Sequence, residues 1–291
     1  MRGDAEATTL LRPRSPAEAL RLLDAHRDAL PIAGGTDLMV AWNAGALAGR
    51  TFLDLSTLAG WRRIRATQKA LVVGALATHT ELLRHPVVRR RLPLLAEACA
   101  TVGGVQIQNR GTLGGNLANA SPAGDTFPSL AVYEAVVGLV SAGRRRDVPL
   151  HQFFTGPKRT CLAPGELVES VRIPLPARPP TRAVFRKVGT RAAQAISKTV
   201  AAGLVWLARD GRVEELRFAL GSMAPTVRRL RGAEAFVKGK RLTREVVHEA
   251  CALVSADVSP IDDVRSTAEY RLAVSRNLLS QLLSGIAASR G

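Results

Sequence analysis

Hydrophobic and polar positions along the chain form short apolar runs between amphipathic stretches, a pattern that predicts strands mixed with helices. Apolar runs at residues 30–33, 52–55 and 71–74 predict strands in the early part of the chain. Similar runs at residues 135–140 and 167–173 predict later strands of the same sheet. This mixture of elements indicates an α+β architecture.

Helix start signals precede two of the amphipathic stretches. Ser15-Pro16-Ala17-Glu18 is a capping box with proline at the first helical position, and it predicts a helix through about His26. Thr78-His79-Thr80-Glu81 is a second capping box, whose helix should end before Pro86 because proline disfavours a helical residue in front of it. A further helix is expected from Leu94 to about Thr101.

A cluster of prolines at residues 174–180 divides this pattern in two. Such a segment cannot form a regular helix or a central strand, so we interpret it as a linker. Beyond it, residues 199–207 and 216–220 predict strands, and residues 243–256 and 266–283 predict helices. Strands followed by helices predict a second α+β domain.

The formal net charge of +17 would suit a nucleic-acid-binding protein. However, the arginine runs at residues 89–91 and 144–146 are short, and few aromatic residues accompany them for base stacking. We therefore expect no nucleic-acid partner. The charge fits either a solvated face or a docking surface for acidic partner subunits.

Further sequence features indicate the cellular compartment of the protein. No apolar run approaches the roughly 20 residues needed to cross a bilayer, so we expect no membrane span. Acidic residues close to Met1 do not fit a secretory signal. Cys99, Cys161 and Cys251 lie far apart without C-x-x-C spacing, which speaks against a local zinc or iron–sulfur motif. These features predict a cytoplasmic protein with free thiols and no metal site of its own.

The histidines show no catalytic pattern. They are unclustered, no H-E-x-x-H segment occurs, and no serine or cysteine nucleophile elbow is present. We therefore expect no hydrolytic or acid–base machinery and no catalytic residue. The five histidines are His26, His79, His85, His151 and His248.

Two glycine-paired segments, which we expect to form loops, carry the strongest chemical signal, at residues 33–38 and 111–116. Each places a Gly-Gly step beside a threonine hydroxyl. Glycine lets the backbone approach a ligand, and successive amides can then form an anion site. Neither segment matches G-x-G-x-x-G or G-x-x-x-x-G-K-[ST], so a Rossmann or P-loop fold is poorly supported. The pattern favours a dinucleotide held by a different fold.

The first glycine segment lies within Ile32-Ala33-Gly34-Gly35-Thr36-Asp37-Leu38. Two further stretches follow it, residues 106–116 and Ser121-Pro122-Ala123-Gly124-Asp125. Together, these stretches resemble the FAD-binding medium subunit of the molybdenum hydroxylases. This is the family of xanthine dehydrogenase and carbon monoxide dehydrogenase. The resemblance covers nearly the whole chain in the family's order. Further matching segments are residues 74–75, 78–82, 153–156, 165–167, 185–188, 263–265 and 270–271.

The resemblance implies a two-lobed FAD-binding domain of the vanillyl-alcohol-oxidase (PCMH) type at residues 1–176, with lobes at about 1–58 and 59–176. Residues 177–180 would then be the proline-rich linker. Residues 181–291 would form a small C-terminal domain with a three-stranded antiparallel sheet and helices.

The resemblance also implies which residues bind FAD. The first segment would wrap the pyrophosphate, although a tight turn at Gly34-Gly35 is the alternative. The second would bind phosphate, ribityl or ring polar atoms. Asp125 would meet a hydroxyl-bearing part of the cofactor, although a turn residue is the alternative. Val168 would lie against the isoalloxazine. Lys187, or Arg186 in its place, would lie near the flavin, and a solvated basic edge is the alternative for these cations. The full set is Ile32, Ala33, Gly34, Gly35, Thr36, Asp37, Leu38, Val102, Thr112, Leu113, Gly114, Gly115, Asn116, Asp125, Val168 and Lys187.

The implied function is electron transfer within a molybdenum hydroxylase complex. A large molybdopterin subunit would oxidise the substrate, and a small [2Fe-2S] subunit would pass single electrons to the FAD of this chain. NAD, a quinone, oxygen or another acceptor would receive them, and the complex would be a dimer of heterotrimers. Two alternatives are a scaffold subunit that has lost flavin and a free-standing flavin oxidase. The intact glycine segments disfavour the scaffold, and the absence of acid–base groups disfavours the oxidase.

Overall fold

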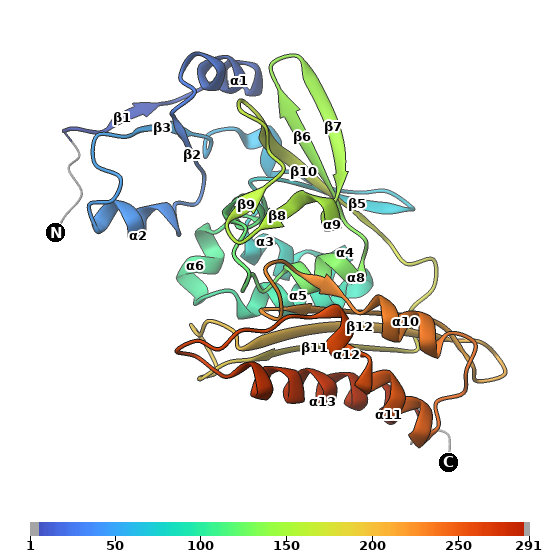
Figure 1. Cartoon of the computed structure of the whole chain (residues 1–291). Coiled ribbons are helices and arrows are strands. Elements are labelled where there is room, and N and C mark those ends of the chain that lie inside the picture. Colours follow the sequence, from blue (N-terminus) through green and yellow to red (C-terminus); the bar gives the residue numbers. More distant parts are fainter. Residues whose placement is uncertain (1–5, 288–291) are drawn as a thin grey trace.

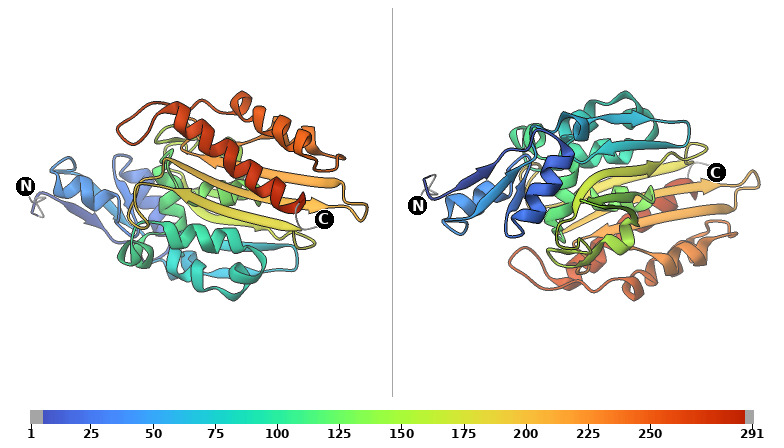
Figure 2. Two further views of the ribbon diagram at one scale, coloured as in Figure 1. Left: turned by 90° about the horizontal axis from the view of Figure 1, so that it is seen from below. Right: turned by 90° about the horizontal axis from the view of Figure 1, so that it is seen from above.

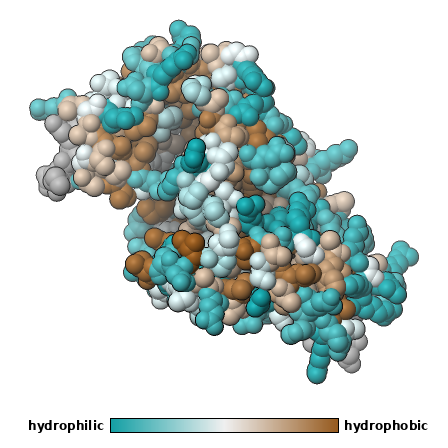
Figure 3. Space-filling model, in the orientation of Figure 1, coloured by the Kyte–Doolittle hydropathy of each residue, from teal (hydrophilic) through white to brown (hydrophobic). Residues whose placement is uncertain are grey.

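The computed structural model describes residues 6–287. Figure 1 shows three parts in chain order: a small N-terminal lobe, a central sheet with helices beside it, and a C-terminal sheet with helices on its outer face. In this described part, no helix is long and apolar enough to cross a membrane. Hydrophilic residues occupy most protruding positions on the face in Figure 3, while hydrophobic residues form smaller groups between them.

The N-terminal lobe is a parallel sheet with one covering helix. Its elements are β1 (Thr9–Leu11), α1 (Pro16–Ala25), β2 (Leu30–Ile32), α2 (Leu38–Asn43) and β3 (Thr51–Asp54). The strand order is β1-β3-β2, with both pairings parallel. Ala19, Leu20 and Leu23 of α1 belong to the buried cluster that includes Leu53 of the central strand.

The two predicted capping boxes differ in the structure. Before α1, the Ser15 hydroxyl accepts a hydrogen bond from the N–H of Glu18, but the Glu18 carboxylate accepts from the N–H of Arg14 instead of Ser15. Only half of that capping box therefore forms. At residues 78–81 both reciprocal hydrogen bonds are present.

The central part is built on a five-stranded antiparallel sheet in the order β4-β5-β10-β6-β7. The predicted strands at 71–74, 135–140 and 167–173 all belong to it, whereas those at 30–33 and 52–55 form the separate sheet of the first lobe. The strands are β4 (Ile64–Ala66), β5 (Ala70–Gly74), β6 (Val136–Ser141), β7 (Arg144–Pro149) and β10 (Leu167–Pro174), with the hairpin β8 (Phe154–Gly156) and β9 (Arg159–Thr160) beside them.

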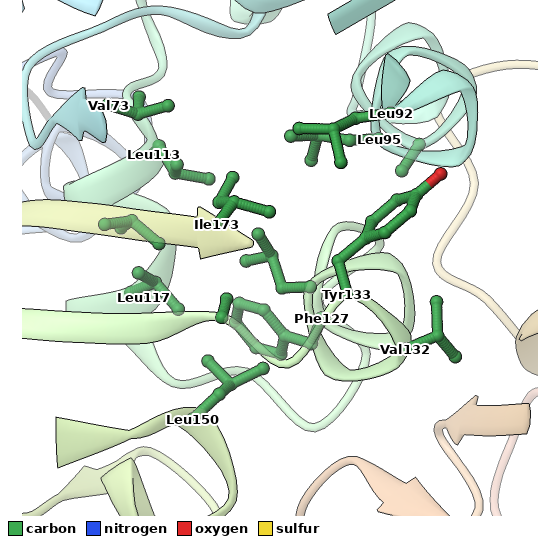
Figure 4. Packing of buried hydrophobic residues seen from close by; sticks show 14 of the residues in the cluster. Val73, Leu92, Leu95, Leu113, Leu117, Phe127, Val132, Tyr133, Leu150 and Ile173 are labelled. Atoms are coloured by element: carbon green, nitrogen blue, oxygen red, sulfur yellow. The ribbon is translucent and has the colours of Figure 1, made fainter. Parts of the chain in front are cut away.

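Short helices pack against this sheet and contribute residues to its core. Figure 4 shows Leu113 and Leu117 near Ile173 and Phe127 in one cluster of buried side chains. Leu113, Leu117 and Ile173 have no exposed surface. The helices are η1 (Ala59–Arg62, 3-10), α3 (His79–Arg84), α4 (Pro86–Arg91), α5 (Pro93–Thr101), α6 (Val105–Arg110), α7 (Leu113–Asn119), α8 (Phe127–Val132) and α9 (Leu150–Phe153).

The C-terminal domain is an antiparallel sheet in the order β11-β12-β13-β14. Three long strands form it, as expected, but a two-residue fourth strand, β14, was not predicted. The elements are β11 (Arg182–Val188), β12 (Thr199–Leu207), β13 (Val213–Gly221), β14 (Arg228–Arg229), α10 (Arg231–Val237), α11 (Arg244–Ala252), α12 (Val254–Asp257) and α13 (Ala268–Ala287). The helix predicted at 243–256 is therefore interrupted at Leu253, between α11 and α12.

Strand β12 joins the two domains because its two faces pack against different hydrophobic cores. All nine of its residues are buried. Val200 and Leu204 face the core that includes α5 and α8, whereas Ala201 and Val205 face the core that includes α13. A strand buried on both faces gives a continuous apolar run, which is what residues 199–207 show. Figure 2 shows α13 lying along the outer side of this sheet.

Candidate functional site

A cavity of about 610 Å³ lies between the N-terminal lobe and the central part. Both glycine-paired segments line it, together with the end of α5 and the start of β10. Its size falls within the range usual for small-molecule and cofactor sites. It contains these residues of the proposed set: Ala33, Gly34, Gly35, Thr36, Asp37, Leu38, Val102, Thr112, Gly114, Gly115, Asn116 and Val168.

The first glycine segment leaves β2 and turns into α2. Gly35 has a φ of +76°, which favours glycine at this turn. A Cβ at Gly34 would overlap the carbonyl oxygen of Arg110, so this glycine allows two backbones to meet where the lobes join. Among the described residues, none accepts a hydrogen bond from the N–H groups of Gly34, Gly35 or Thr36. Three amide donors are therefore available at the cavity wall.

The second glycine segment is the beginning of a helix rather than a loop, which corrects our expectation. The Thr112 hydroxyl caps α7 by accepting from the N–H of Gly115 at 3.1 Å. The N–H of Gly114 donates to the carbonyl of Ala75, and the N–H of Asn116 donates to that of Thr112. These amides are already satisfied within the protein. The second segment shapes the wall, while free amide donors come from the first.

Glycine at position 114 allows α7 to pack closely against Ala75. A Cβ there would lie 2.6 Å from the Cβ of Ala75, which is closer than such atoms come. At Gly115 a Cβ would meet only the Thr112 hydroxyl, at 2.9 Å. Gly114 therefore brings α7 against the end of β5, and Gly115 keeps the cap of α7 uncrowded.

Four residues of the proposed set do not line this cavity. Ile32 lines a second cavity of about 310 Å³ on the other side of the first glycine segment. Leu113 has no exposed surface and belongs to the hydrophobic core. Asp125 and Lys187 form an ion pair with each other, at the contact between the central part and the C-terminal sheet.

The Asp125–Lys187 pair is short and buried. The Lys187 ammonium lies 2.7 Å from Oδ2 of Asp125 and also donates to the carbonyl of Thr101 at 2.9 Å. Oδ1 of Asp125 is buried without a hydrogen-bond partner in the described part of the protein. Burial raises the pKa of Asp125 to about 6, and the neighbouring Lys187 opposes that rise. Arg186, the competing cation, is exposed and donates to the carbonyl of Phe185.

Three further ionisable residues line the cavity and were not in the proposed set. His79 is 1% exposed, and burial lowers its pKa to about 4. Lys158 donates to Oδ1 of Asn119 at 2.6 Å. Glu166 pairs with Arg146 at 2.6 Å, and that guanidinium lowers the pKa of the carboxyl group. His79 and Glu166 lie in segments that match the family, but no sequence spacing links the three residues, because they reach the cavity from separate parts of the chain.

Part of the cavity wall is apolar. Leucines from α1, from the segments after β3 and β5, from the segment between β9 and β10, and from β10 contribute to it, and they provide a surface for an aromatic ring. They are Leu23, Leu55, Leu76, Leu162 and Leu167. Free backbone amides near an apolar wall fit a cofactor that combines a diphosphate with aromatic rings, as FAD does.

In the range 6–287, no group of three or more histidine, cysteine, aspartate or glutamate side chains is placed to hold a metal ion. The three cysteines are free in the structure.

Comparisons with known proteins agree with this geometry. Residues 6–176 match the family described as "FAD binding domain in molybdopterin dehydrogenase". Residues 184–286 match the "CO dehydrogenase flavoprotein C-terminal domain".

Similar relatives cover almost the entire chain. The carbon monoxide dehydrogenase medium chain of Hydrogenophaga pseudoflava is 32% identical, over 94% of this chain and 94% of that protein. A putative xanthine dehydrogenase FAD-binding subunit of Escherichia coli is 29% identical, over 96% of each chain.

Solved structures show the same fold. Carbon monoxide dehydrogenase from Hydrogenophaga pseudoflava superposes with a TM-score of 0.90 at 30% identity, over 99% of this chain and 98% of the other. Quinoline 2-oxidoreductase from Pseudomonas putida gives a TM-score of 0.90 at 26% identity, over 99% of each chain. The chain therefore belongs to the family of FAD-binding medium subunits of the molybdenum hydroxylases, and it is an oxidoreductase subunit whose cofactor is FAD.

Proposed function

We propose that FAD lies in the 610 Å³ cavity with its diphosphate at the amides of Gly34, Gly35 and Thr36. The observation that carries this placement is that these three N–H groups have no acceptor among the described residues. Consecutive backbone donors suit an anion without any lysine in the segment. The apolar part of the cavity wall would then receive an aromatic ring of the cofactor.

Electron transfer is the proposed role of the bound cofactor. FAD can accept electrons singly and release them in pairs, so it can connect a one-electron donor to a two-electron acceptor. We propose a small [2Fe-2S] subunit as the donor, and NAD, a quinone, oxygen or another molecule as the acceptor. A large molybdopterin subunit would oxidise the substrate, in a dimer of heterotrimers.

The protein's own contribution is position, electrostatics and exclusion of water. Val102 and Val168 provide apolar contacts at the wall. Lys187, rather than the exposed Arg186, is the cation we propose to act on the cofactor, with Asp125 holding it in place. Asp125 and Lys187 do not line the cavity, so they would act from its edge.

The domain boundaries remain part of this proposal. Residues 1–176 would form the FAD-binding domain, 177–180 the linker and 181–291 the C-terminal domain. Residues 1–5 and 288–291 of these ranges lie outside the described residues.

The identity and stoichiometry of the flavin released from the complex, purified from its own host, test this function. Near one FAD for each copy of this chain supports the proposal. A complex that contains the partner subunits but no flavin would show that this chain is a scaffold, and would overturn the electron-transfer role.

A further inference from the structure

His79 forms part of the wall of the proposed FAD cavity, although it is not in the set of cofactor-binding residues implied by the sequence. It is the first residue of α3, and its side chain is almost wholly buried. A β-bridge between Thr78 and Thr112, and a hydrogen bond from the N–H of His79 to the carbonyl of Gly111, hold it there. The imidazole is thus fixed beside the start of the second glycine segment.

The imidazole faces the region where the two glycine segments meet. A Cβ at Gly111 would lie 3.3 Å from Cδ2 of His79 and 3.4 Å from the hydroxyl of Thr36. His79 and Thr36 therefore flank the bare backbone of Gly111. Gly34 packs against the same backbone, next to the amides that have no acceptor among the described residues.

The ring nitrogens of His79 have different surroundings. Nδ1 is buried and has no hydrogen-bond partner among the described residues. A buried N–H without an acceptor is rarer than an acceptor without a donor, so we assign the proton of the neutral ring to Nε2. Nε2 is bonded to Cδ2, the His79 atom that a Cβ at Gly111 would approach to 3.3 Å. The donor of the imidazole is therefore on the edge that faces the glycine segments.

The protonation state of the ring supports this assignment. Burial is the cause of its low pKa, and no neighbouring charge contributes. The carboxylate closest in sequence, Glu81, accepts hydrogen bonds from Thr78 and Arg62. At neutral pH the ring is therefore an uncharged donor.

We propose that the Nε2–H group of His79 donates a hydrogen bond to a diphosphate oxygen of FAD, beside the amides of the first glycine segment. This inference rests on the proposed function, because it requires FAD in the cavity. A phosphate oxygen is an acceptor only, which matches a ring that offers one N–H at this edge. His79 is thus a cofactor-binding residue that supplements the set derived from the sequence.

The experiment compares the binding of FAD and riboflavin to the complete complex after removal of its flavin. Riboflavin has the ring and ribityl chain but no phosphate. We expect His79→Leu to weaken FAD binding by about tenfold and to leave riboflavin binding unchanged. We expect His79→Gln, which keeps an N–H donor near the position of Nε2, to bind FAD more tightly than His79→Leu.

His85→Leu is the matched control. His85 follows the same helix and also has a buried Nδ1 without a partner, but it does not line the cavity. We expect this variant to bind FAD as the wild type does.

Each alternative outcome has a distinct meaning. Equal FAD affinity in His79→Leu and the wild type overturns the inference alone. A parallel loss of riboflavin binding also overturns it, because the residue would then only support the shape of the cavity. A wild-type complex that binds no FAD overturns the proposed function and, with it, this inference.

Discussion

Lys187 of the C-terminal sheet and Asp125 of the central part form a buried ion pair across the contact between the two domains. The ammonium and carboxylate lie 2.7 Å apart, with side chains that are 11% and 10% exposed. Removing one partner of such a pair leaves a charge buried without compensation, which is far more costly than removing both. The pair therefore contributes to the stability of the contact between the two domains.

Lys187→Ala is expected to destabilise the protein by about 3 kcal/mol, because Asp125 is then left buried and unpaired. The double variant Asp125→Ala with Lys187→Ala should lose less than the sum of the two single variants. Urea unfolding of all four proteins measures this coupling. Additive losses would show that the pair contributes no coupling.

The same Lys187→Ala variant tests the electrostatic role proposed for this cation. We expect it to retain FAD but to shift the reduction potential of the flavin or slow its reduction. Redox titration and stopped-flow reduction of the intact complex measure both quantities. Unchanged potential and kinetics would remove Lys187 from the site while leaving its structural role intact.

The pH dependence of stability should contain two opposing contributions. The pKa of Asp125 is raised to about 6, so its contribution is fully present below the unfolded pKa near 4 and is lost as pH rises to 6. The pKa of His79 is lowered to about 4, so its contribution is present above 6.5 and is lost as pH falls. The two therefore act in opposite directions between pH 4 and 6.

Single variants separate these contributions. The free energy of unfolding of the wild type, minus that of Asp125→Asn, should fall as pH rises from 4 to 6. The same difference taken with His79→Gln should rise over this range. Unfolding free energies measured at several pH values give both differences. Curves that run parallel for a variant and the wild type would show that the residue in question does not titrate as its burial implies.

Gly34→Ala should weaken flavin retention by moving the two lobes apart. Its Cβ would overlap the carbonyl oxygen of Arg110, so backbone on one side must shift. Gly60→Ala is a suitable control, because a Cβ there meets no atom within 4 Å. The flavin content of the purified complexes and their melting temperatures test this prediction, which normal flavin content in Gly34→Ala would contradict.

Gly115→Val should also abolish flavin retention while leaving most of the fold. The new side chain would crowd the Thr112 hydroxyl that caps α7 and extend into the cavity wall. Flavin released by denaturation, compared with the circular dichroism of the same sample, distinguishes loss of cofactor from loss of fold. Full FAD occupancy would refute our placement of the second segment at the site.

Much of the secondary structure followed from local pattern. The capping box at residues 78–81 and the apolar run at 199–207 correspond closely to α3 and β12. The helical start at Leu113 was missed, because Gly114 and Gly115 are poor helix formers. Tertiary contacts explain why glycine occurs at the start of this helix, since Gly114 lets α7 pack against Ala75.

The sequence by itself determined the alternation of strands and helices and the family resemblance, because apolar period and glycine spacing are local properties of the chain. Only the tertiary structure decided which glycine segment keeps free amides, since the N–H of Gly114 finds its acceptor, Ala75, far away in the sequence. It also decided that His79 lines the cavity and that Lys187 reaches Asp125. Such relations depend on long-range packing, so no pattern of neighbouring residues contains them.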